Sequence, residues 1–251
     1  MHDRVALVTG GGSGIGHAAV LEFARRGAAV AVVDIALEAA ERIAAELRAA
    51  GGRALAIRAD VSIEADVRAM VSQTLAEFGR LDFAFNNAGI LGPIGTPLHE
   101  LDEPAWDRVL DTNLKSVWLS MKHEIAAMLD RGGGSIVNNA SIVGLRAATL
   151  NPSYGASKHG VVGLTLAAAS YYGDRDIRVN AVCPGVVLTS MTGAADAAPD
   201  SPSSRRIARA PLRRGAQAVE VARAAVWLCS DEASYLTGVA LPVDGGLSVL
   251  A

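Results

Sequence analysis

A run of glycines directly after a short apolar stretch is the feature that most constrains how this chain folds. Residues 5–9 read Val-Ala-Leu-Val-Thr, and Gly10-Gly11-Gly12-Ser13-Gly14-Ile15-Gly16 follows at once. A short apolar run bounded by a turn signal is typical of a strand buried on both faces. Apolar residues at helical spacing then predict a helix over residues 15–26. The order of strand, glycine turn and helix predicts the first half of a βαβ unit that binds a dinucleotide.

An acidic residue follows at the distance that such a unit requires. A second apolar run, residues 28–34, ends in Asp34, which lies 20 positions beyond Gly14. The glycines let the backbone approach a pyrophosphate, whose charge is then stabilised by the N-terminus of the helix. A carboxylate at the end of the second strand can bind the adenosine ribose hydroxyls. Asp34 therefore favours NAD over NADP as the cofactor.

Three side chains in the second half of the chain indicate a chemistry. Ser141 precedes Tyr154 by 13 positions, and Lys158 follows Tyr154 by four. Residues four apart share one face of a helix, and an ammonium beside a tyrosine should lower the tyrosine pKa from its ordinary value of about 10. The pair could then exchange a proton with an alcohol or ketone while Ser141 donates to the same oxygen. Taken alone, the Tyr-x-x-x-Lys spacing is a weak signal and is more typical of an ordinary amphipathic helix.

Strand-like and helix-like segments alternate along the chain, which predicts βαβ units and a parallel sheet. The expected fold is a single α/β domain over residues 1–251, with a Rossmann-like, doubly wound sheet of about seven strands flanked by helices. Strands are predicted at residues 5–9, 28–34, 53–59, 82–86, 134–140, 177–183 and 239–243, and helices at 15–26, 38–50, 64–79, 103–130, 153–173 and 217–229. Every motif then falls at the carboxyl edge of the sheet, where ligands bind in such folds.

The longest irregular stretch covers residues 186–216 and is predicted to be a substrate lid. It carries five arginines, at positions 205, 206, 209, 213 and 214. They could bind an anionic substrate, but clustered charges usually face solvent, and the sequence favours that interpretation.

Composition narrows the class of protein. A hydrophobic content of 51% supports one large core, and a formal net charge of -3 argues against a nucleic-acid surface. The first strand begins too early to leave room for a signal peptide, and no apolar run approaches the ~20 residues that span a bilayer. Two cysteines and five histidines without metal-ligand spacing predict a cytoplasmic protein with no disulfide framework and no metal.

Taken together, these motifs resemble the short-chain dehydrogenase/reductase family over nearly the whole chain. The likeness rests on the Thr9–Gly16 glycine motif, Asp60-Val61, Asn86-Asn87-Ala88-Gly89, Asn113, Asn138-x-x-Ser141-x-x-Gly144, Tyr154-x-x-x-Lys158, Arg178-Val179-Asn180, Pro184-Gly185-x-x-x-Thr189 and Asp244-Gly245-Gly246. Ala140 stands where a second serine is common in the family.

The resemblance implies roles for individual residues. The catalytic set would be Asn113, Ser141, Tyr154 and Lys158, with Asn113 supporting a water chain from Lys158 to solvent. The cofactor would contact Gly10, Ser13, Gly14, Ile15, Gly16, Asp34, Ile35, Asp60, Val61, Asn87, Ala88, Gly89, Tyr154, Lys158, Pro184, Gly185, Val187 and Thr189. The substrate would contact Ser141, Val143, Leu145, Tyr154 and Val186, with Leu91, Ile94 and Leu150 nearby. Family members form dimers and tetramers through the helices that carry Asn113 and Tyr154, so a homotetramer is expected.

The expected function is an NAD-dependent dehydrogenase of secondary alcohols, reversible as a ketone reductase. Because the expected substrate contacts are mostly apolar, a hydrophobic or cyclic alcohol fits better than a sugar. One alternative is a 3-oxoacyl thioester reductase that uses NADPH, against which Asp34 and Ser13 stand. Another is a protein that binds the cofactor without catalysis, against which the complete catalytic set stands.

Overall fold

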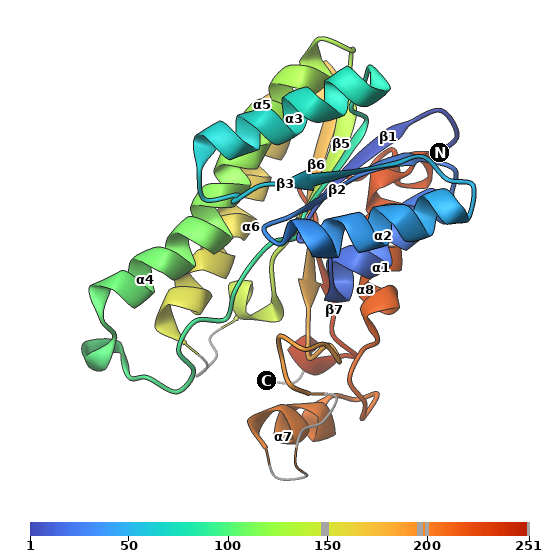
Figure 1. Cartoon of the computed structure of the whole chain (residues 1–251). Helices are drawn as coiled ribbons and strands as arrows, with labels where there is room; N and C mark the ends of the chain where they lie inside the picture. Colours follow the sequence, from blue (N-terminus) through green and yellow to red (C-terminus); the bar gives the residue numbers. More distant parts are fainter. Residues whose placement is uncertain (147–150, 195–197, 199–200, 250–251) are drawn as a thin grey trace.

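A computed structural model describes residues 1–146, 151–194, 198 and 201–249, and Figure 1 shows its arrangement. The strands are β1 (Val5–Thr9), β2 (Ala29–Asp34), β3 (Ala54–Arg58), β4 (Phe83–Asn86), β5 (Gly134–Asn139), β6 (Ile177–Pro184) and β7 (Ala240–Val243). The α-helices are α1 (Gly14–Arg25), α2 (Leu37–Ala49), α3 (Glu64–Phe78), α4 (Glu103–Leu110), α5 (Ser116–Leu129), α6 (Pro152–Tyr172), α7 (Pro202–Arg209) and α8 (Ala218–Cys229).

The strands form one parallel sheet in the order β3-β2-β1-β4-β5-β6-β7. The chain first winds outward from β1 to β3 and then returns to place β4 on the other side of β1. This reversal opens a crevice at the carboxyl ends of β1 and β4, the place where open α/β sheets bind ligands. The predicted fold class is confirmed.

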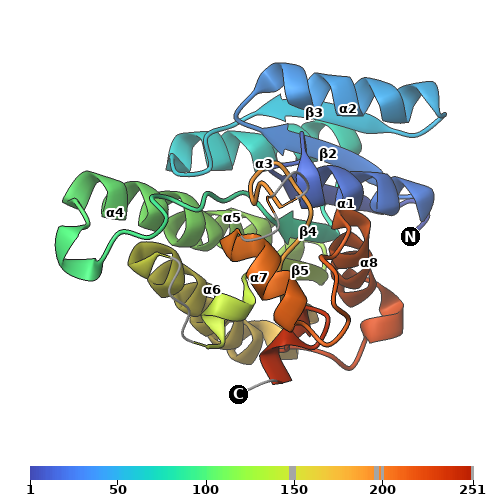
Figure 2. The same cartoon turned by 90° about the horizontal axis from the view of Figure 1, so that it is seen from below.

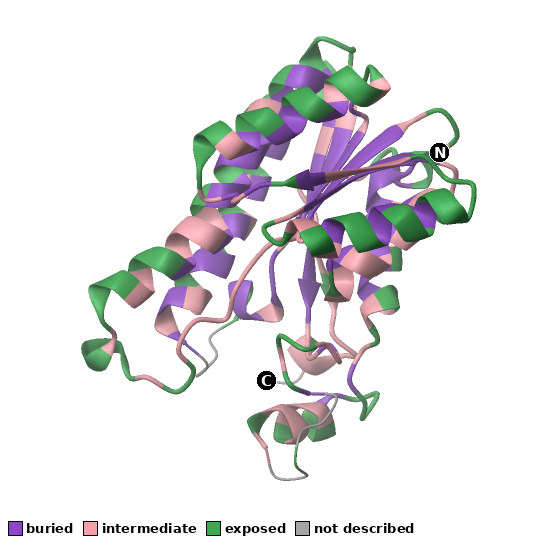
Figure 3. Cartoon of the chain, viewed as in Figure 1, coloured by how far each residue is buried: buried purple, intermediate pink, exposed green. Residues whose placement is uncertain are grey.

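Helices cover both faces of the sheet, because strands this apolar must be buried on both sides. All five residues of β1 are buried. Buried residues of α3, α5 and α6 form the core on one face, and those of α1, α2 and α8 form the core on the other. Figure 3 shows that the strands are mostly buried and that the exposed residues lie on the outer faces of the helices. Among the described helices, none is long and apolar enough to cross a membrane.

Two predicted segments differ from the structure. The helix predicted over residues 103–130 is present, but a turn of π-helix, Asp111–Lys115, divides it into α4 and α5. A π-turn keeps the backbone helical, and the sequence analysis did not identify it. The stretch 186–216 contains the helix α7, which the sequence analysis missed because it is strongly polar. Its start is set by Ser201, whose hydroxyl accepts from the Ser204 amide at 3.1 Å.

A polar network crosses the core beneath the crevice. The Asn86 amide of β4 donates to Glu124 of α5 at 3.0 Å and to Asn138 of β5 at 3.1 Å. Asn138 in turn donates to the Thr165 hydroxyl of α6 at 3.0 Å. Within the described residues, Glu124 Oε1 and Asn86 Oδ1 have no hydrogen-bond partner. Burial raises the pKa of Glu124 to about 7, although the bond from Asn86 opposes the rise.

The raised pKa of Glu124 predicts a pH-dependent stability. The folded protein holds the proton more tightly than the unfolded chain, so its stability falls as pH rises through the folded pKa near 7. Ionisation of the folded state well above that pH should cost about 3 kcal/mol. The Glu124→Gln variant stays neutral, so the melting temperature of the variant relative to the wild type should rise from about pH 5 to pH 7 and level off above that, where Glu124 is ionised in both states.

Thermal melts of wild type, Glu124→Gln and Glu77→Gln across that pH range would check this prediction. Glu77 lies on the exposed face of α3 and controls for the loss of one negative charge. Melting curves that shift in parallel for wild type and Glu124→Gln would contradict the assignment.

Candidate active site

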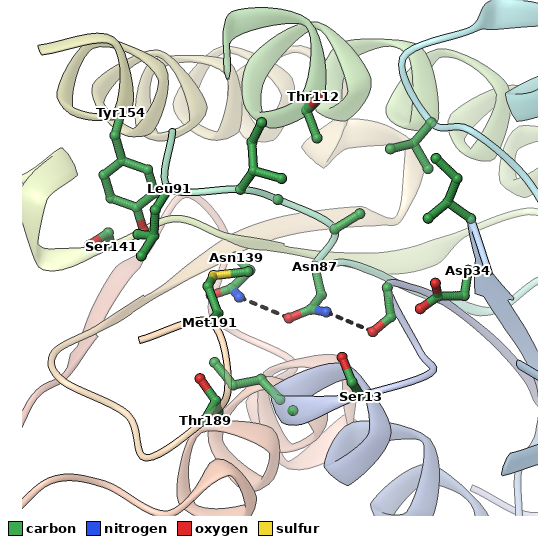
Figure 4. A pocket seen from close by; sticks show the side chains of 18 of the residues that line it. Ser13, Asp34, Asn87, Leu91, Thr112, Asn139, Ser141, Tyr154, Thr189 and Met191 are labelled. Carbon is green, nitrogen blue, oxygen red and sulfur yellow. Dashed lines mark hydrogen bonds between the residues drawn. The ribbon is translucent and has the colours of Figure 1, made fainter. Parts of the chain in front are cut away.

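A cavity of about 730 Å³ lies at the carboxyl edge of the sheet, within the size range of small-molecule and cofactor sites. Figure 4 shows its side chains, which come from segments far apart in the sequence. Most of the residues expected at the site line this cavity: Gly10, Ser13, Gly14, Ile15, Asp34, Ile35, Asp60, Val61, Asn87, Ala88, Gly89, Ser141, Tyr154, Lys158, Pro184, Gly185, Val187 and Thr189. Five expected residues do not line it: Gly16, Asn113, Val143, Leu145 and Val186.

The glycine loop opens the cavity at the start of α1. Gly10 and Gly14 have φ values of 62° and 54°, a backbone conformation that other residues rarely adopt. Ser13 precedes α1 but makes no side-chain capping hydrogen bond. Gly16 lies behind the loop, where an added Cβ would meet the Gly10 carbonyl oxygen at 2.0 Å. Gly16 therefore allows the helix to pack closely against the loop, and the uncapped end of α1 is open to an anion.

Asp34 closes the other end of the loop. Its carboxylate accepts from the Gly12 amide at 2.9 Å and from the Ala36 amide at 3.1 Å. A Cβ on Gly12 would lie 2.8 Å from the same carboxylate. The side chain is thus held at the rim of the cavity by two backbone donors, next to the exposed Ile35.

Asn87 links the ends of three strands. Its amide donates to the Thr9 carbonyl at 3.0 Å and to the Gly10 carbonyl at 3.3 Å, and it accepts from Asn139 at 2.9 Å. The Lys158 ammonium donates to the Asn139 carbonyl at 2.7 Å. This chain of bonds, part of which is drawn in Figure 4, joins the glycine loop to the residues of α6.

Lys158 and Tyr154 lie on one face of α6, as their spacing predicts. The Lys158 ammonium lies 5.6 Å from the centre of the Tyr154 ring. Lys158 is 4% exposed, and its burial lowers its pKa to about 8. Burial also raises the pKa of Tyr154, whereas hydrogen bonding by Ser141 and the charge of Arg206 oppose the rise. The pKa of Tyr154 as a whole lies above its ordinary value, because desolvation outweighs the hydrogen bond of Ser141 and the charge of Arg206. A lowering contribution from Lys158 stays a prediction.

Ser141 follows β5 directly and is brought to the tyrosine by that strand's position in the sheet. Its side chain is 7% exposed and accepts from the Val143 amide at 3.2 Å. In Figure 4 the hydroxyl groups of Ser141 and Tyr154 lie together at one end of the cavity. An oxygen placed there would meet both groups.

Asn113 belongs to the π-helical turn and lies behind the cavity wall. Its side chain is fully buried, accepting from the Ile90 amide and donating to the Ile90 carbonyl, both at 2.8 Å. It also donates to the Ser157 hydroxyl at 3.3 Å. Asn113 therefore holds the chain after β4 against α6, and this contact positions the residues that face Lys158.

The expected substrate residues are more dispersed. Val143 is buried beneath Gly155, and Leu145 is 36% exposed. Val186 lines a smaller, neighbouring cavity. Leu91 lines the main cavity, Ile94 is exposed, and Leu150 lies outside the described residues.

The sequence analysis missed several residues that line the cavity. They are Val33, Ala59, Ser62, Ile90, Arg108, Asp111, Thr112, Asn139, Ala140, Ser190, Met191 and Thr192. Position at the carboxyl end of a strand could have identified Asn139, the last residue of β5, since the carboxyl ends of parallel strands meet at one edge. Thr112 depends on the π-helical turn, which periodicity does not reveal. No cluster of metal-ligand residues occurs in the part of the chain that the structure describes.

Comparisons with known proteins agree with this architecture. A model of the short-chain dehydrogenase/reductase family, described as enoyl-(acyl carrier protein) reductase, matches residues 10–248. Cyclohexanol dehydrogenase of Acinetobacter sp. is 43% identical over 97% of this chain and 94% of its own length. A 2,5-dichloro-2,5-cyclohexadiene-1,4-diol dehydrogenase of Sphingobium indicum is 46% identical over 100% of this chain and 99% of its own.

A comparison with solved structures agrees with these sequence matches. The crystal structure of levodione reductase superposes with a TM-score of 0.95 at 38% sequence identity, and 100% of each chain is covered. Matches of this extent, at this identity, cover the glycine loop, the strand ends and the Tyr154 helix alike. The chain belongs to the short-chain dehydrogenase/reductase family of oxidoreductases.

Proposed function

We propose that this protein is an NAD-dependent dehydrogenase that interconverts a cyclic or hydrophobic secondary alcohol and its ketone. The observation that carries the proposal is the convergence of Ser141, Tyr154 and Lys158 on one cavity with the glycine loop and Asp34. A proton-transfer group and a dinucleotide site at the two ends of one cavity are what hydride exchange with an alcohol requires.

The residues present fit a nicotinamide dinucleotide. The uncapped N-terminus of α1 and the backbone at Gly14 would hold the pyrophosphate. Asp34 would accept hydrogen bonds from the adenosine ribose, and Lys158 would hold the nicotinamide ribose. Arg42, which approaches the loop from α2, donates to the Gly12 carbonyl at 3.1 Å and does not line the cavity. None of the described residues that line this end of the cavity therefore favours the additional phosphate of NADP.

The chain's own groups would handle the proton. When bound, the cofactor supplies the acceptor or donor of hydride. Ser141 orients the substrate oxygen by donating a hydrogen bond to it, and Tyr154 takes the hydroxyl proton on its phenolic oxygen. Lys158 provides a positive charge beside the tyrosine, which stabilises the phenolate form of Tyr154 that accepts this proton and so becomes the neutral phenol. Because burial keeps the pKa of Tyr154 high, oxidation of the alcohol should accelerate as pH rises.

The substrate class follows from the wall around the reacting groups. Ile90, Leu91 and Met191 line the cavity near them, and apolar walls favour a hydrocarbon ring over a sugar. The names of cyclohexanol dehydrogenase and of the dichlorocyclohexadiene-diol dehydrogenase, similar over nearly the whole chain, support a cyclic substrate.

We also propose that residues 1–251 act as one domain in which residues 186–216 serve as the substrate lid. Ser190, Met191 and Thr192 of this stretch line the main cavity, and α7 lies beyond the carboxyl end of the sheet in Figure 1. Both cysteines are free and buried, which supports the proposal of a reducing, cytoplasmic location.

One observation favours the alternative function, a reductase of acyl thioesters. The family model that matches residues 10–248 is described as a reductase of acyl carrier protein substrates. An NADPH-dependent reductase of 3-oxoacyl thioesters would use the same Ser141 and Tyr154. Cofactor preference separates the two functions, because Asp34 should reject NADPH.

The proton-transfer role predicts the effect of one substitution. Tyr154→Phe keeps the ring but removes the hydroxyl, and general acid–base catalysis typically contributes ~10²–10⁴-fold to a rate. With cyclohexanol and NAD, kcat should fall by at least ~100-fold while NADH titrations show unchanged binding. Tyr171→Phe is the matched control, since Tyr171 is an exposed tyrosine of the same helix. Near-normal turnover by Tyr154→Phe would refute the role.

The cofactor preference is a second prediction. The phosphate of NADP would face the Asp34 carboxylate at close range. Repulsion between the two anions, and loss of the hydrogen bonds from the ribose to Asp34, would both weaken the binding of NADP. We expect kcat/KM to favour NAD by about a hundredfold, or ~3 kcal/mol. Asp34→Ser with Ile35→Arg should shrink or reverse this preference. Glu41→Gln, which removes an exposed carboxylate from α2, should leave it unchanged. Equal use of NADPH by the wild type would favour the thioester reductase.

We further propose a symmetric homotetramer. A shallow apolar groove of about 460 Å³ runs between α5 and α6, lined by Leu110, Asp111, Leu114, Lys115, Trp118, Gly160, Gly163 and Leu164. Trp118 is 48% exposed there, and a Cβ on Gly163 would meet nothing within 4 Å. A second copy of the same face could cover this groove through a two-fold contact.

Gly163→Glu tests this assembly. The substitution should not harm the fold, because the site is open and glutamate favours a helix more than glycine does. It should lower the mass measured by size exclusion with light scattering from that of a tetramer. Ala49→Glu places the same charge on exposed α2 and should leave the mass unchanged. A wild-type monomer at micromolar concentration would contradict the proposal.

A further inference from the structure

One arginine of α7 differs from the other arginines in residues 186–216. Arg205, Arg209, Arg213 and Arg214 are exposed, as the sequence analysis favours, whereas Arg206 is partly buried. Arg214 forms a two-bonded ion pair with Glu220, at 2.7 Å for each contact. The guanidinium of Arg206 has neither a hydrogen bond nor an ion pair with any residue that the structure describes. Partial burial without a partner is unfavourable for a guanidinium, so this side chain is left to bind something else.

Arg206 lines a second cavity, of about 290 Å³. Apolar residues form much of its wall: Val186, Ile207, Ala210, Leu212, Ala216, Pro242, Val243 and Leu247. The other charged residues around it are already engaged. Arg214 and Glu220 pair with each other, and the Asp244 carboxylate accepts from the Gly246 and Ser248 amides at 2.9 and 2.6 Å. Among the described charged residues of this wall, Arg206 is the one whose side chain makes no hydrogen bond or ion pair, whereas Asp244 keeps its negative charge but is hydrogen-bonded to two backbone amides.

The second cavity adjoins the reacting groups. The segment after β6 separates it from the main cavity, since Gly185 and Val187 line the main cavity and Val186 lines the second. Arg206 is also close enough to Tyr154 for their charges to interact. The positive charge lowers the pKa of Tyr154, while burial lowers and Tyr154 raises the pKa of Arg206. α7 lies beyond the carboxyl end of the sheet in Figure 1, and in the view from below in Figure 2 it lies in front of the sheet.

We propose that Arg206 binds a carboxylate at the far end of the substrate, so that the natural substrate is a cyclic alcohol or ketone that carries a carboxylate. This inference rests on the proposed function, because it assumes that the hydroxyl carbon sits at Ser141 and Tyr154. A planar guanidinium in partly desolvated surroundings binds a carboxylate through two parallel hydrogen bonds. A cofactor phosphate is a poorer candidate for this arginine, because the glycine loop that would hold it lies at the end of the main cavity away from Ser141 and Tyr154 (Figure 4).

Binding measurements test the proposal without turnover. The probes are cyclohexanecarboxylate and cyclohexanecarboxamide, which have the same ring and differ in charge. Isothermal titration of the NADH-loaded protein should give at least tenfold tighter binding of the acid than of the amide. Arg206→Gln should abolish that preference, and Arg206→Lys should restore only part of it, because an ammonium lacks the two-bonded geometry. Arg205→Gln, at the exposed neighbouring position, should retain the full preference.

Equal affinity of the wild type for acid and amide, or a preference for the acid that survives in Arg206→Gln, would overturn the proposal. Melting temperatures show whether a variant has lost affinity because it is misfolded. The ratio of acid affinity to amide affinity, measured within one variant, does not depend on the fraction of that variant that is folded. Failure of the proposed function gives a different result. In that case the wild type would oxidise neither cyclohexanol nor 4-hydroxycyclohexanecarboxylate with NAD, whatever the outcome of the titrations.

Discussion

The hydrogen bonds of Asn87 hold the carboxyl ends of three neighbouring strands together, and the geometry of the site depends on them. The side chain spans from the carbonyls of Thr9 and Gly10, after β1, to Asn139 at the end of β5. The carbonyl of Asn139 then receives the Lys158 ammonium at 2.7 Å. A loop that should hold phosphates and a helix that should carry the proton donor are thereby joined through one partly buried amide. Neither could shift alone without leaving polar groups unpaired.

Desolvation dominates the electrostatics of the site. Burial raises the pKa of Tyr154 and lowers that of Lys158 to about 8, so both groups are biased toward their neutral forms. A neutral tyrosine is a proton donor suited to ketone reduction, whereas oxidation requires the phenolate. Ser141 and Arg206 work against the burial. The pH range in which the enzyme oxidises the alcohol or reduces the ketone should therefore depend on the balance between burial and these two residues, and not on the Tyr154–Lys158 pair alone.

Residues 186–216 connect the chemistry to the choice of substrate. This stretch places Met191 at the main cavity and Arg206 at the second, so a single segment lines both cavities. The rest of the sheet edge is built from backbone and short polar groups that suit a cofactor. Substrate selection can then change through this stretch while the proton-transfer groups remain fixed by α6 and β5.

The sequence by itself determined the sheet, the glycine loop and the spacing of Ser141, Tyr154 and Lys158, because buried strands, tight turns and helix faces leave local patterns that sequence shows. It could not place Asn113, because one extra residue in a π-helical turn leaves the periodicity intact while moving the side chain behind the cavity. Nor could it distinguish Arg206 from Arg205, since burial beside Tyr154 depends on how α7 packs against distant segments. The pKa values were likewise decided only by the tertiary structure, because desolvation is a property of the surrounding atoms and not of the neighbours in sequence.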